Sequence, residues 1–159
     1  LQPAPGRMQL CGKHASGAAV YVDYAHTPDA LETVLKSLRP HTSGKLHVVF
    51  GCGGDRDPGK RVLMGKAAAD FADNVILTDD NPRTEDAVLI RKAALEGAPN
   101  AEEISDRRVA IQVAVKGLRT GDILVIAGKG HEQGQTIGDT VHPFNDADEV
   151  QAALAGGDA

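Results

Sequence analysis

The sequence has little of several features that mark particular classes of protein. It contains no Trp, two Tyr and three Phe among its 159 residues, so it lacks a platform on which single-stranded nucleic acids could stack. Its 17 basic and 22 acidic residues give a net charge of −5, which argues against nucleic-acid and anionic-membrane binding. No apolar run approaches the ~20 residues that span a bilayer, and no signal peptide is visible. We therefore expect a cytoplasmic protein.

Cysteine and histidine are also scarce in the patterns that bind metals. Cys11 and Cys52 are the two cysteines, and their spacing is not that of metal ligands. They indicate free thiols in a reducing compartment, with a single disulfide as the alternative. His26 and His131 lack the spacing of zinc ligands, so we expect no metal site within this chain.

The chain length suits one domain. The opening residues 1–7 are rich in Pro and Gly, which is typical of a linker. Residues 8–159 would then form a single domain. Since the chain starts at Leu1 and not at Met, we also expect it to be a piece of a longer protein.

Short apolar strands alternate with amphipathic helices along the chain. Thr27 and Pro28 are typical of a helix start, and Asp106 is a second predicted cap. Thr84 is a third, with Glu85 and Asp86 in its first turn. The predicted strands are 8–11, 18–22, 45–50, 74–77 and 122–127, and helices follow near 28–38, 61–71, 85 onward, 106–118 and 146 onward. This alternation predicts an α/β fold, doubly wound, with a mostly parallel sheet and helices on both faces.

Four predicted loops follow strands and combine Gly with charged residues: 23–26, 51–61, 79–83 and 128–132. In open α/β sheets, ligands bind at the carboxyl ends of the strands. The loops carry the basic residues Arg56, Lys60, Arg61, Arg83 and Lys129, and acidic residues beside them. A site with both signs suits a zwitterion such as a free amino acid. The alternative is that loops are simply where polar residues lie.

The glycine-rich loop 51–61 approaches two nucleotide motifs without matching either. Arg56 stands where a dinucleotide fingerprint needs Gly or Ala, and Arg61 stands where a phosphate loop needs Ser or Thr. We therefore interpret the glycines as allowing a tight turn that places Arg56 over the crevice. A small nucleotide-binding enzyme such as a kinase remains an alternative.

The loop Asp80-Asn81-Pro82-Arg83 should be stiff, because proline fixes its own φ and restricts the residue before it. Arg83 could grip a ligand carboxylate through two hydrogen bonds while Asp80 accepts an ammonium. Alternatively, Asp80 and Arg83 could form an internal salt bridge that only ties the turn.

Taken together, four segments resemble the Mur ligase family, and specifically the ligases that add the third residue of the peptidoglycan stem peptide. They are Val-Asp-Tyr-Ala-His-Thr-Pro-Asp at 22–29, Phe-Gly-Cys-Gly-Gly-Asp-Arg-Asp at 50–57, Asp-Asp-Asn-Pro-Arg-Thr-Glu at 79–85 and Ala-Gly-Lys-Gly-His-Glu at 127–132. The opening Pro-Gly-Arg-Met at 5–8 resembles the family's junction between the central and C-terminal domains.

The resemblance implies a Rossmann-like C-terminal domain of an ATP-dependent ligase. Such an enzyme would add meso-diaminopimelate to UDP-N-acetylmuramoyl-L-alanyl-D-glutamate in peptidoglycan synthesis. The missing N-terminal and central domains would bind the UDP substrate, ATP and Mg²⁺, so this chain would be inactive alone. The alternatives are a lysine-adding relative and a non-catalytic amino-acid-binding module.

The resemblance also assigns roles to individual residues. Arg83 would select diaminopimelate, since lysine-adding relatives lack this Arg and lysine lacks the second carboxylate. No general base is assigned, although His131 is a candidate. The implied substrate-binding residues are Arg56, Asp80, Asn81, Pro82, Arg83, Gly128 and Glu132, and the implied nucleotide-contacting or hinge residues are Asp23, Tyr24 and His26.

Overall fold

The computed structural model of the protein describes residues 8–130 and 132–156. The predicted linker 1–7 and His131 lie outside the described residues. The strands are β1 (Gln9–Lys13), β2 (Ala19–Asp23), β3 (Leu46–Phe50), β4 (Asn74–Leu77), β5 (Glu102–Glu103), β6 (Ile123–Ala127), β7 (Gly134–Ile137) and β8 (Thr140–Pro143). The helices are α1 (Pro28–Leu38), α2 (Gly59–Phe71), α3 (Ala87–Leu95), α4 (Arg107–Lys116) and α5 (Asp146–Gly156), and a 3₁₀ turn η1 spans Arg39–His41.

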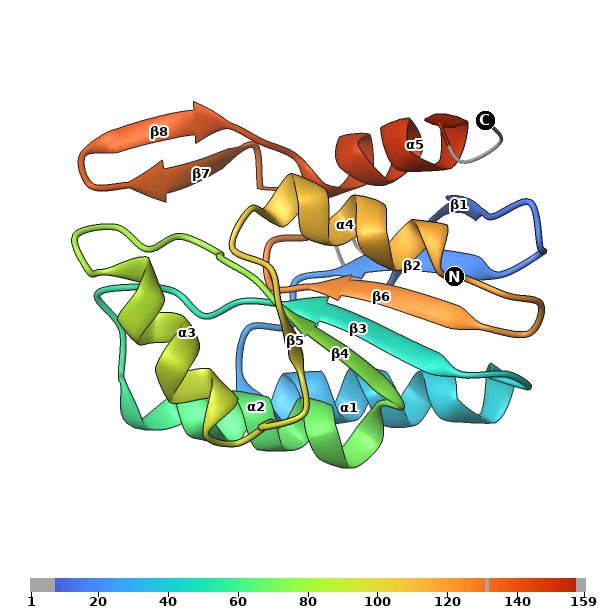
Figure 1. The fold of residues 1–159 in the computed structure, drawn as a ribbon, viewed down its shortest axis with the longest axis horizontal. Helices are drawn as coiled ribbons and strands as arrows, with labels where there is room; N and C mark the ends of the chain where they lie inside the picture. The colour runs from blue at the N-terminus through green and yellow to red at the C-terminus, as the bar shows by residue number, and fades with distance from the viewer. Residues whose placement is uncertain (1–7, 131, 157–159) are drawn as a thin grey trace.

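A six-stranded sheet with the order β1-β2-β6-β3-β4-β5 forms the centre of the molecule. Strands β2, β6, β3, β4 and β5 pair in parallel, and β1 pairs antiparallel with β2. Helices α1, α2 and α3 cover one face, while α4 and α5 cover the other (Figure 1). The predicted fold class is therefore confirmed.

Alternation along the strands produces two separate apolar cores. In β3, Val48 and Phe50 pack in the cluster that includes α1, α2 and α3, while Val49 belongs to the cluster that includes α4 and α5. In β6, Val125 and Ile126 divide between the two clusters in the same way. Successive side chains of a strand point to opposite faces, so these continuous apolar runs are those of a sheet buried on both sides.

Two of the three predicted helix caps are confirmed and one is wrong. The Thr27 side chain accepts a hydrogen bond from Ala30 N at 3.2 Å, and Asp106 accepts one from Val109 N at 3.2 Å. Before α3, however, the cap is Asp86, which accepts from Val88 N at 2.9 Å. Thr84 is not available, because its hydroxyl donates to Asp55 Oδ1 at 2.6 Å.

A second, antiparallel sheet consists of β7 and β8, which the sequence pattern did not predict. The turn between them contains Gly138 at φ +60°, a conformation that glycine adopts without strain. Strand β8 has four residues and is exposed throughout, so it is not marked by a run of core residues. The hairpin lies at the end of the molecule toward which the arrowheads of β3 and β6 point (Figure 1).

Candidate functional site

A crevice of about 400 Å³ lies at the carboxyl ends of the parallel strands. All four predicted loops contribute to its lining, although they are far apart in sequence. The predicted site residues that line it are Tyr24, His26, Arg56, Asp80, Asn81, Arg83, Gly128 and Glu132. Asp23 and Pro82 are not among the lining residues. The structure thus brings most of the predicted site together around one cavity.

Three cationic side chains in the crevice have no carboxylate partner in the part of the chain that the structure describes. Arg83 Nη1 donates to two backbone carbonyls, Gly54 O at 2.9 Å and Asn81 O at 3.4 Å. Arg56 Nη1 donates to the carbonyl of Asp55 at 3.0 Å. Within the described residues, neither arginine nor Lys60 forms an ion pair with a carboxylate. This arrangement leaves positive charge available to an anionic group of a ligand.

The alternative of an internal Asp80–Arg83 salt bridge is wrong. Asp80 instead pairs with Lys129, whose Nζ lies 3.4 Å from Asp80 Oδ1. Arg83 is held in the left-handed region, at φ +53°, which is uncommon for a residue with a side chain. Its amide donates to Thr136 O at 3.0 Å, and Gly138 N donates to the Arg83 carbonyl. The hairpin therefore fixes the backbone on which the Arg83 guanidinium is mounted.

Two glycines of the 51–61 loop are required by close packing, and Arg56 of the same loop lines the crevice. A Cβ on Gly54 would lie 1.8 Å from Pro82 O, and one on Gly53 would lie 2.9 Å from Arg83 Nη1. The two loops are also joined by Gly54 N, which donates to Asn81 O at 2.7 Å. Pro82 thus contributes to the site through this packing of its backbone, even though it does not line the crevice.

Acidic and amide groups surround the buried Lys129 beside the crevice, from loops 79–83 and 128–132. Lys129 has no solvent exposure, and its Nζ lies 2.9 Å from Asn81 Oδ1 and 3.6 Å from Glu132 Oε1. Gln135 of β7 donates to the Asp80 carbonyl at 2.7 Å. Glu132 keeps 36% of its side chain exposed, so the crevice also offers negative charge to a ligand ammonium.

Two buried arginines, which sequence reasoning did not single out, hold the frame below the crevice. Arg107 pairs with both oxygens of Asp146, at 2.8 and 2.7 Å, and both side chains are fully buried. It also donates to the carbonyls of Asp79 and Ala127, each at 3.1 Å. Asp79 begins one site loop and Ala127 directly precedes another. Burial would lower the pKa of Arg107, but Asp146 outweighs it and the pKa is raised. A cation in the first turn of a helix is unfavourable, because it opposes the helix macrodipole. The position of Arg107 at the start of α4 was therefore the sequence signal that could have pointed to a special role.

Asp79 is held by its side chain as well. Arg91 of α3 donates to Asp79 Oδ1 at 2.6 Å and to Glu103 Oε2 at 2.8 Å. Burial raises the pKa of Asp79 despite the bond from Arg91. The carboxylate of Asp79 is occupied by Arg91, so Asp79 positions the loop. The neighbouring Asp80 lines the crevice, as do Asp57 and Glu132.

The residues assigned to the hinge form a small group at the end of β2. Asp23 is 6% exposed, and its carboxylate accepts from Met8 N and Ala25 N, both at 2.7 Å. It therefore ties the start of the described chain to the crevice edge. Tyr24 and His26 make an edge-on ring contact with centroids 4.6 Å apart, and His26 Nδ1 lies 2.9 Å from the Tyr24 carbonyl.

Both cysteines are free and buried, so the disulfide alternative is wrong. Cys52 lines the crevice. Burial raises the pKa of its thiol to about 12, and the negative charge of Asp80 adds to the effect. A thiol with such a pKa stays protonated at neutral pH and is a poor nucleophile.

The 51–61 loop does not form a cradle for nucleotide phosphates. Such cradles use free backbone N–H groups, but here Gly54 N donates to Asn81 O, Asp55 N to Glu85 and Gly59 N to Asp57. Glu85 is itself held by Arg61 at 2.7 Å. Within residues 8–130 and 132–156, no group of three or more His, Cys, Asp or Glu could hold a metal ion. The 51–61 loop therefore does not fit the phosphates of ATP.

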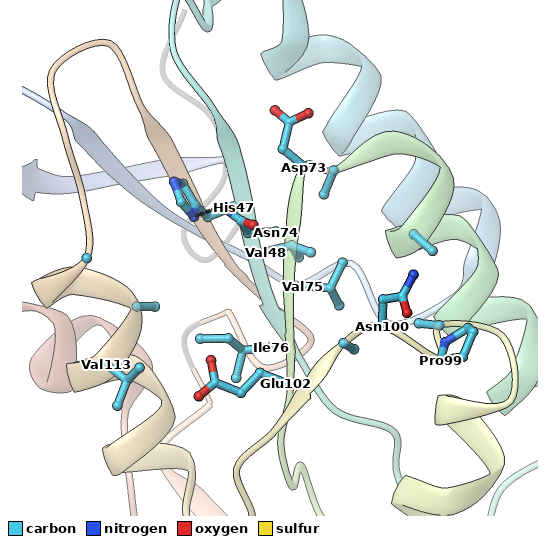
Figure 2. Close-up of a pocket in the computed structure, with 16 residues that line it drawn as sticks. His47, Val48, Asp73, Asn74, Val75, Ile76, Pro99, Asn100, Glu102 and Val113 are labelled. Atoms are coloured by element: carbon cyan, nitrogen blue, oxygen red, sulfur yellow. Dashed lines mark hydrogen bonds between the residues drawn. The ribbon is translucent and has the colours of Figure 1, made fainter.

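A second hollow, of about 570 Å³, follows the outer edge of β4 and differs from the crevice in chemistry. Figure 2 shows His47 and Asn74 side by side in it; their ring nitrogen and amide nitrogen are 3.2 Å apart. His47 Nε2 also lies 2.9 Å from Asp122 Oδ2. Asp73 accepts from Arg39 and from Leu46 N, both at 2.8 Å. These polar groups are engaged in holding the fold.

In the described part of the chain, no helix is both long and apolar enough to cross a membrane.

Residues 6–130 match the family model described as Mur ligase, glutamate ligase domain. A Caulobacter vibrioides protein named UDP-N-acetylmuramoyl-L-alanyl-D-glutamate–2,6-diaminopimelate ligase is 60% identical over 159 residues, which are 100% of this chain and 33% of that protein. A Mesorhizobium japonicum protein of the same name is 61% identical over 154 residues, covering 97% of this chain and 32% of that protein.

Solved structures agree with these relatives. The structure of a ligase with that same name superposes with a TM-score of 0.91 at 49% identity, over 100% of this chain and 33% of that one. A murein peptide ligase from Psychrobacter arcticus superposes with a TM-score of 0.67 at 18% identity, over 96% of this chain and 30% of that one, and shows the shared fold alone. The chain spans about a third of the length of the relatives it matches. On this evidence the chain belongs to the Mur ligase family and corresponds to its C-terminal domain.

Proposed function

We propose that this chain presents meso-diaminopimelate to the rest of a ligase that adds it to UDP-N-acetylmuramoyl-L-alanyl-D-glutamate. The observation that carries the proposal is the guanidinium of Arg83, which lines the crevice without a carboxylate partner among the described residues. Relatives that are about 60% identical bear the name of a diaminopimelate ligase, which supports the same substrate.

The charges of the crevice suit both ends of this amino acid. Arg83 and Arg56 would bind carboxylates, and Asp80 and Glu132 would accept hydrogen bonds from an ammonium; all four line the crevice. Lysine lacks the distal carboxylate and would leave Arg83 unpaired in a partly closed site. A missing charge-assisted hydrogen bond costs about 1.5–3 kcal/mol, and a site built for a polar group rejects analogues that lack it.

The rest of the ligase would supply what this chain does not hold. ATP and Mg²⁺ would bind mainly to the central domain and activate the carboxylate of the UDP substrate, in the cytoplasm, where ATP is available and thiols stay reduced. This chain would contribute positioning. It would hold the diaminopimelate amine and carry it to the activated carboxylate when the domains close. Alone, it would be catalytically inert.

The proposal is tested by titrating the isotope-labelled chain with meso-diaminopimelate and, separately, with L-lysine, while recording backbone amide shifts. We expect shifts at Arg56, at 80–83 and at Gly128 and Glu132, larger for diaminopimelate. The same two amino acids are then compared as substrates of the complete ligase. Equal use of both by the complete ligase would overturn the substrate assignment. A complete ligase inactive with both would overturn the proposed activity.

A further inference from the structure

Lys129 is the most deeply buried cation next to the crevice. It lies two residues beyond β6 and has no solvent exposure. Lysine is almost never fully buried unless it is paired, because removing an ammonium from water is costly. Lys129 does not line the crevice, so the proposed amino acid would not touch it. Its burial therefore calls for a role within the site's framework.

The partners of Lys129 are three residues that do line the crevice. Its Nζ lies 2.9 Å from Asn81 Oδ1, 3.4 Å from Asp80 Oδ1 and 3.6 Å from Glu132 Oε1. An ammonium has three N–H donors and no acceptor, so one group faces three oxygens. Asp80 and Asn81 belong to the loop after β4, and Glu132 belongs to the loop after β6. Lys129 thus joins the two loops through one buried charge.

Asn81 shows what this contact does to orientation. Its Oδ1 accepts from Lys129 Nζ and, at 2.9 Å, from Thr136 N of β7. Two donors on the same oxygen fix which way the amide points, because both reject the flipped amide, whose NH₂ would face them. With Oδ1 held by these two donors, the Nδ2 end of the amide points away from Lys129 and Thr136. Since Asn81 lines the crevice, its two N–H donors remain available to a ligand.

The two loops also touch at Gly128, which directly precedes Lys129. Gly128 has φ +116°, and a Cβ there would lie 2.8 Å from Asp80 Oδ2. The same carboxylate is therefore bounded by Gly128 through Oδ2 and by Lys129 through Oδ1. Asp80 and Asn81 are 6% and 7% exposed, so little water competes with these contacts.

We propose that Lys129 is a positioning residue of the amino-acid pocket. Its buried ammonium holds Asn81 with the amide donors toward the crevice and joins Asp80 to Glu132, without contacting the amino acid itself. The proposal rests on the proposed function for the identity of the ligand. It goes further by assigning the orientation of the pocket's polar groups to a residue outside the pocket.

The test uses Lys129→Met in the complete ligase, since Met keeps an unbranched chain and removes the ammonium. Lys116→Met, at the exposed end of α4, is the matched control. We expect the KM for meso-diaminopimelate to rise at least tenfold in Lys129→Met. The KM values for ATP and for the UDP substrate should stay within twofold of wild type. Lys116→Met should match wild type in all three.

A purely structural role would give a different result. It would lower the melting temperature of Lys129→Met and the yield of folded enzyme, and leave the KM for diaminopimelate unchanged. That outcome overturns the positioning role. If Lys129→Met does not fold, Asp80→Asn/Lys129→Met removes both charges of the buried pair. It is compared with Asp80→Asn alone, and equal KM values for diaminopimelate would overturn the proposal.

The orientation of Asn81 has its own readout in the 159-residue chain. The amide proton of Thr136, which bonds to Asn81 Oδ1, should shift in Lys129→Met while the amide of Thr140 in β8 stays in place. An unchanged Thr136 resonance overturns the proposed orientation. A wild-type ligase that does not use diaminopimelate overturns the proposed function instead, and the Thr136 measurement then still decides whether Lys129 orients the pocket.

Discussion

The crevice at the carboxyl ends of the strands and the hollow along β4 differ less in size than in whether their charged side chains are paired within the protein. The hollow is the larger, at about 570 against 400 Å³. However, its Asp73 and His47 are bonded to Arg39 and Asp122, and so stabilise the fold. In the crevice, Arg56 and Arg83 have no carboxylate partner within the described residues. Charge that the fold does not neutralise therefore indicates a ligand site better than volume does.

The largest expected effect concerns the buried frame below the crevice. Arg107→Met would leave Asp146 as an unpaired buried charge, and breaking such a pair costs about 3–5 kcal/mol. Urea unfolding of the chain measures the loss. Arg108→Met is the control, because the Arg108–Glu149 pair has an Arg that is 56% exposed and such pairs contribute about 0–1 kcal/mol. Similar losses in both variants would show that the frame does not depend on Arg107.

A smaller effect is expected when the free charge of the crevice is removed. Arg83→Ala should lower kcat/KM for meso-diaminopimelate in the complete ligase by about 10- to 150-fold, corresponding to roughly 1.5–3 kcal/mol for charge-assisted hydrogen bonds. Steady-state rates with L-lysine should change little. Arg39→Ala, which removes a cation beside the hollow, should leave both rates unchanged. An unaltered preference between the two amino acids in Arg83→Ala would remove the contrast between the two regions.

The carboxylates in and beside the hollow, by contrast, should affect the stability of the fold at low pH. The bond from Arg39 lowers the pKa of Asp73. Burial would raise the pKa of Asp122, but bonds from Lys45 N, His47 and Arg119 N outweigh it and the pKa is lowered. A carboxylate whose pKa is lowered by folding stabilises the folded state at pH values above its unfolded-state pKa. This stabilisation is lost as the pH falls through its folded-state pKa.

As the pH is lowered from 6, the melting temperature should therefore begin to decline once the pH is below about 4. Asp73→Asn should have a lower melting temperature at pH 6, by about 2–4 °C for each kcal/mol lost. It should also show a shallower decline on acidification. An acid decline as steep as that of wild type would show that Asp73 does not contribute to it.

The smallest expected signal is the reactivity of Cys52, which separates the crevice from a catalytic thiol site. With a pKa of about 12, its thiolate fraction at pH 8 should be roughly a thousandfold below that of an ordinary cysteine. Alkylation by iodoacetamide, followed by mass spectrometry, measures it, with Cys52 in unfolded chain as the reference. Rapid labelling of the native protein would mean that the crevice cations activate the thiol.

Much of the fold could be predicted because its signals are local. The run at 45–50 is mostly apolar and forms β3. Thr27-Pro28 predicted the start of α1 through cap chemistry that needs only neighbouring residues. The hairpin could not be predicted, since β7 and β8 are short and contribute no residue to the buried core. Thr84 was assigned as a cap because nothing in the sequence shows that its hydroxyl is taken by Asp55, 29 residues away.

The candidate site shows the same division. The four loops were identified from glycine and charge after predicted strands, and parallel strands place their carboxyl ends at one edge. By itself the sequence therefore determined the fold class, the family and most of the predicted residues that meet at the crevice. Only the tertiary structure decided which cations form ion pairs inside the fold and which do not. Arg107 and Lys129 pair with carboxylates, whereas Arg83 has no carboxylate partner among the described residues. Pairing depends on distances between segments far apart in sequence, and a buried charge needs its partner within a few ångströms.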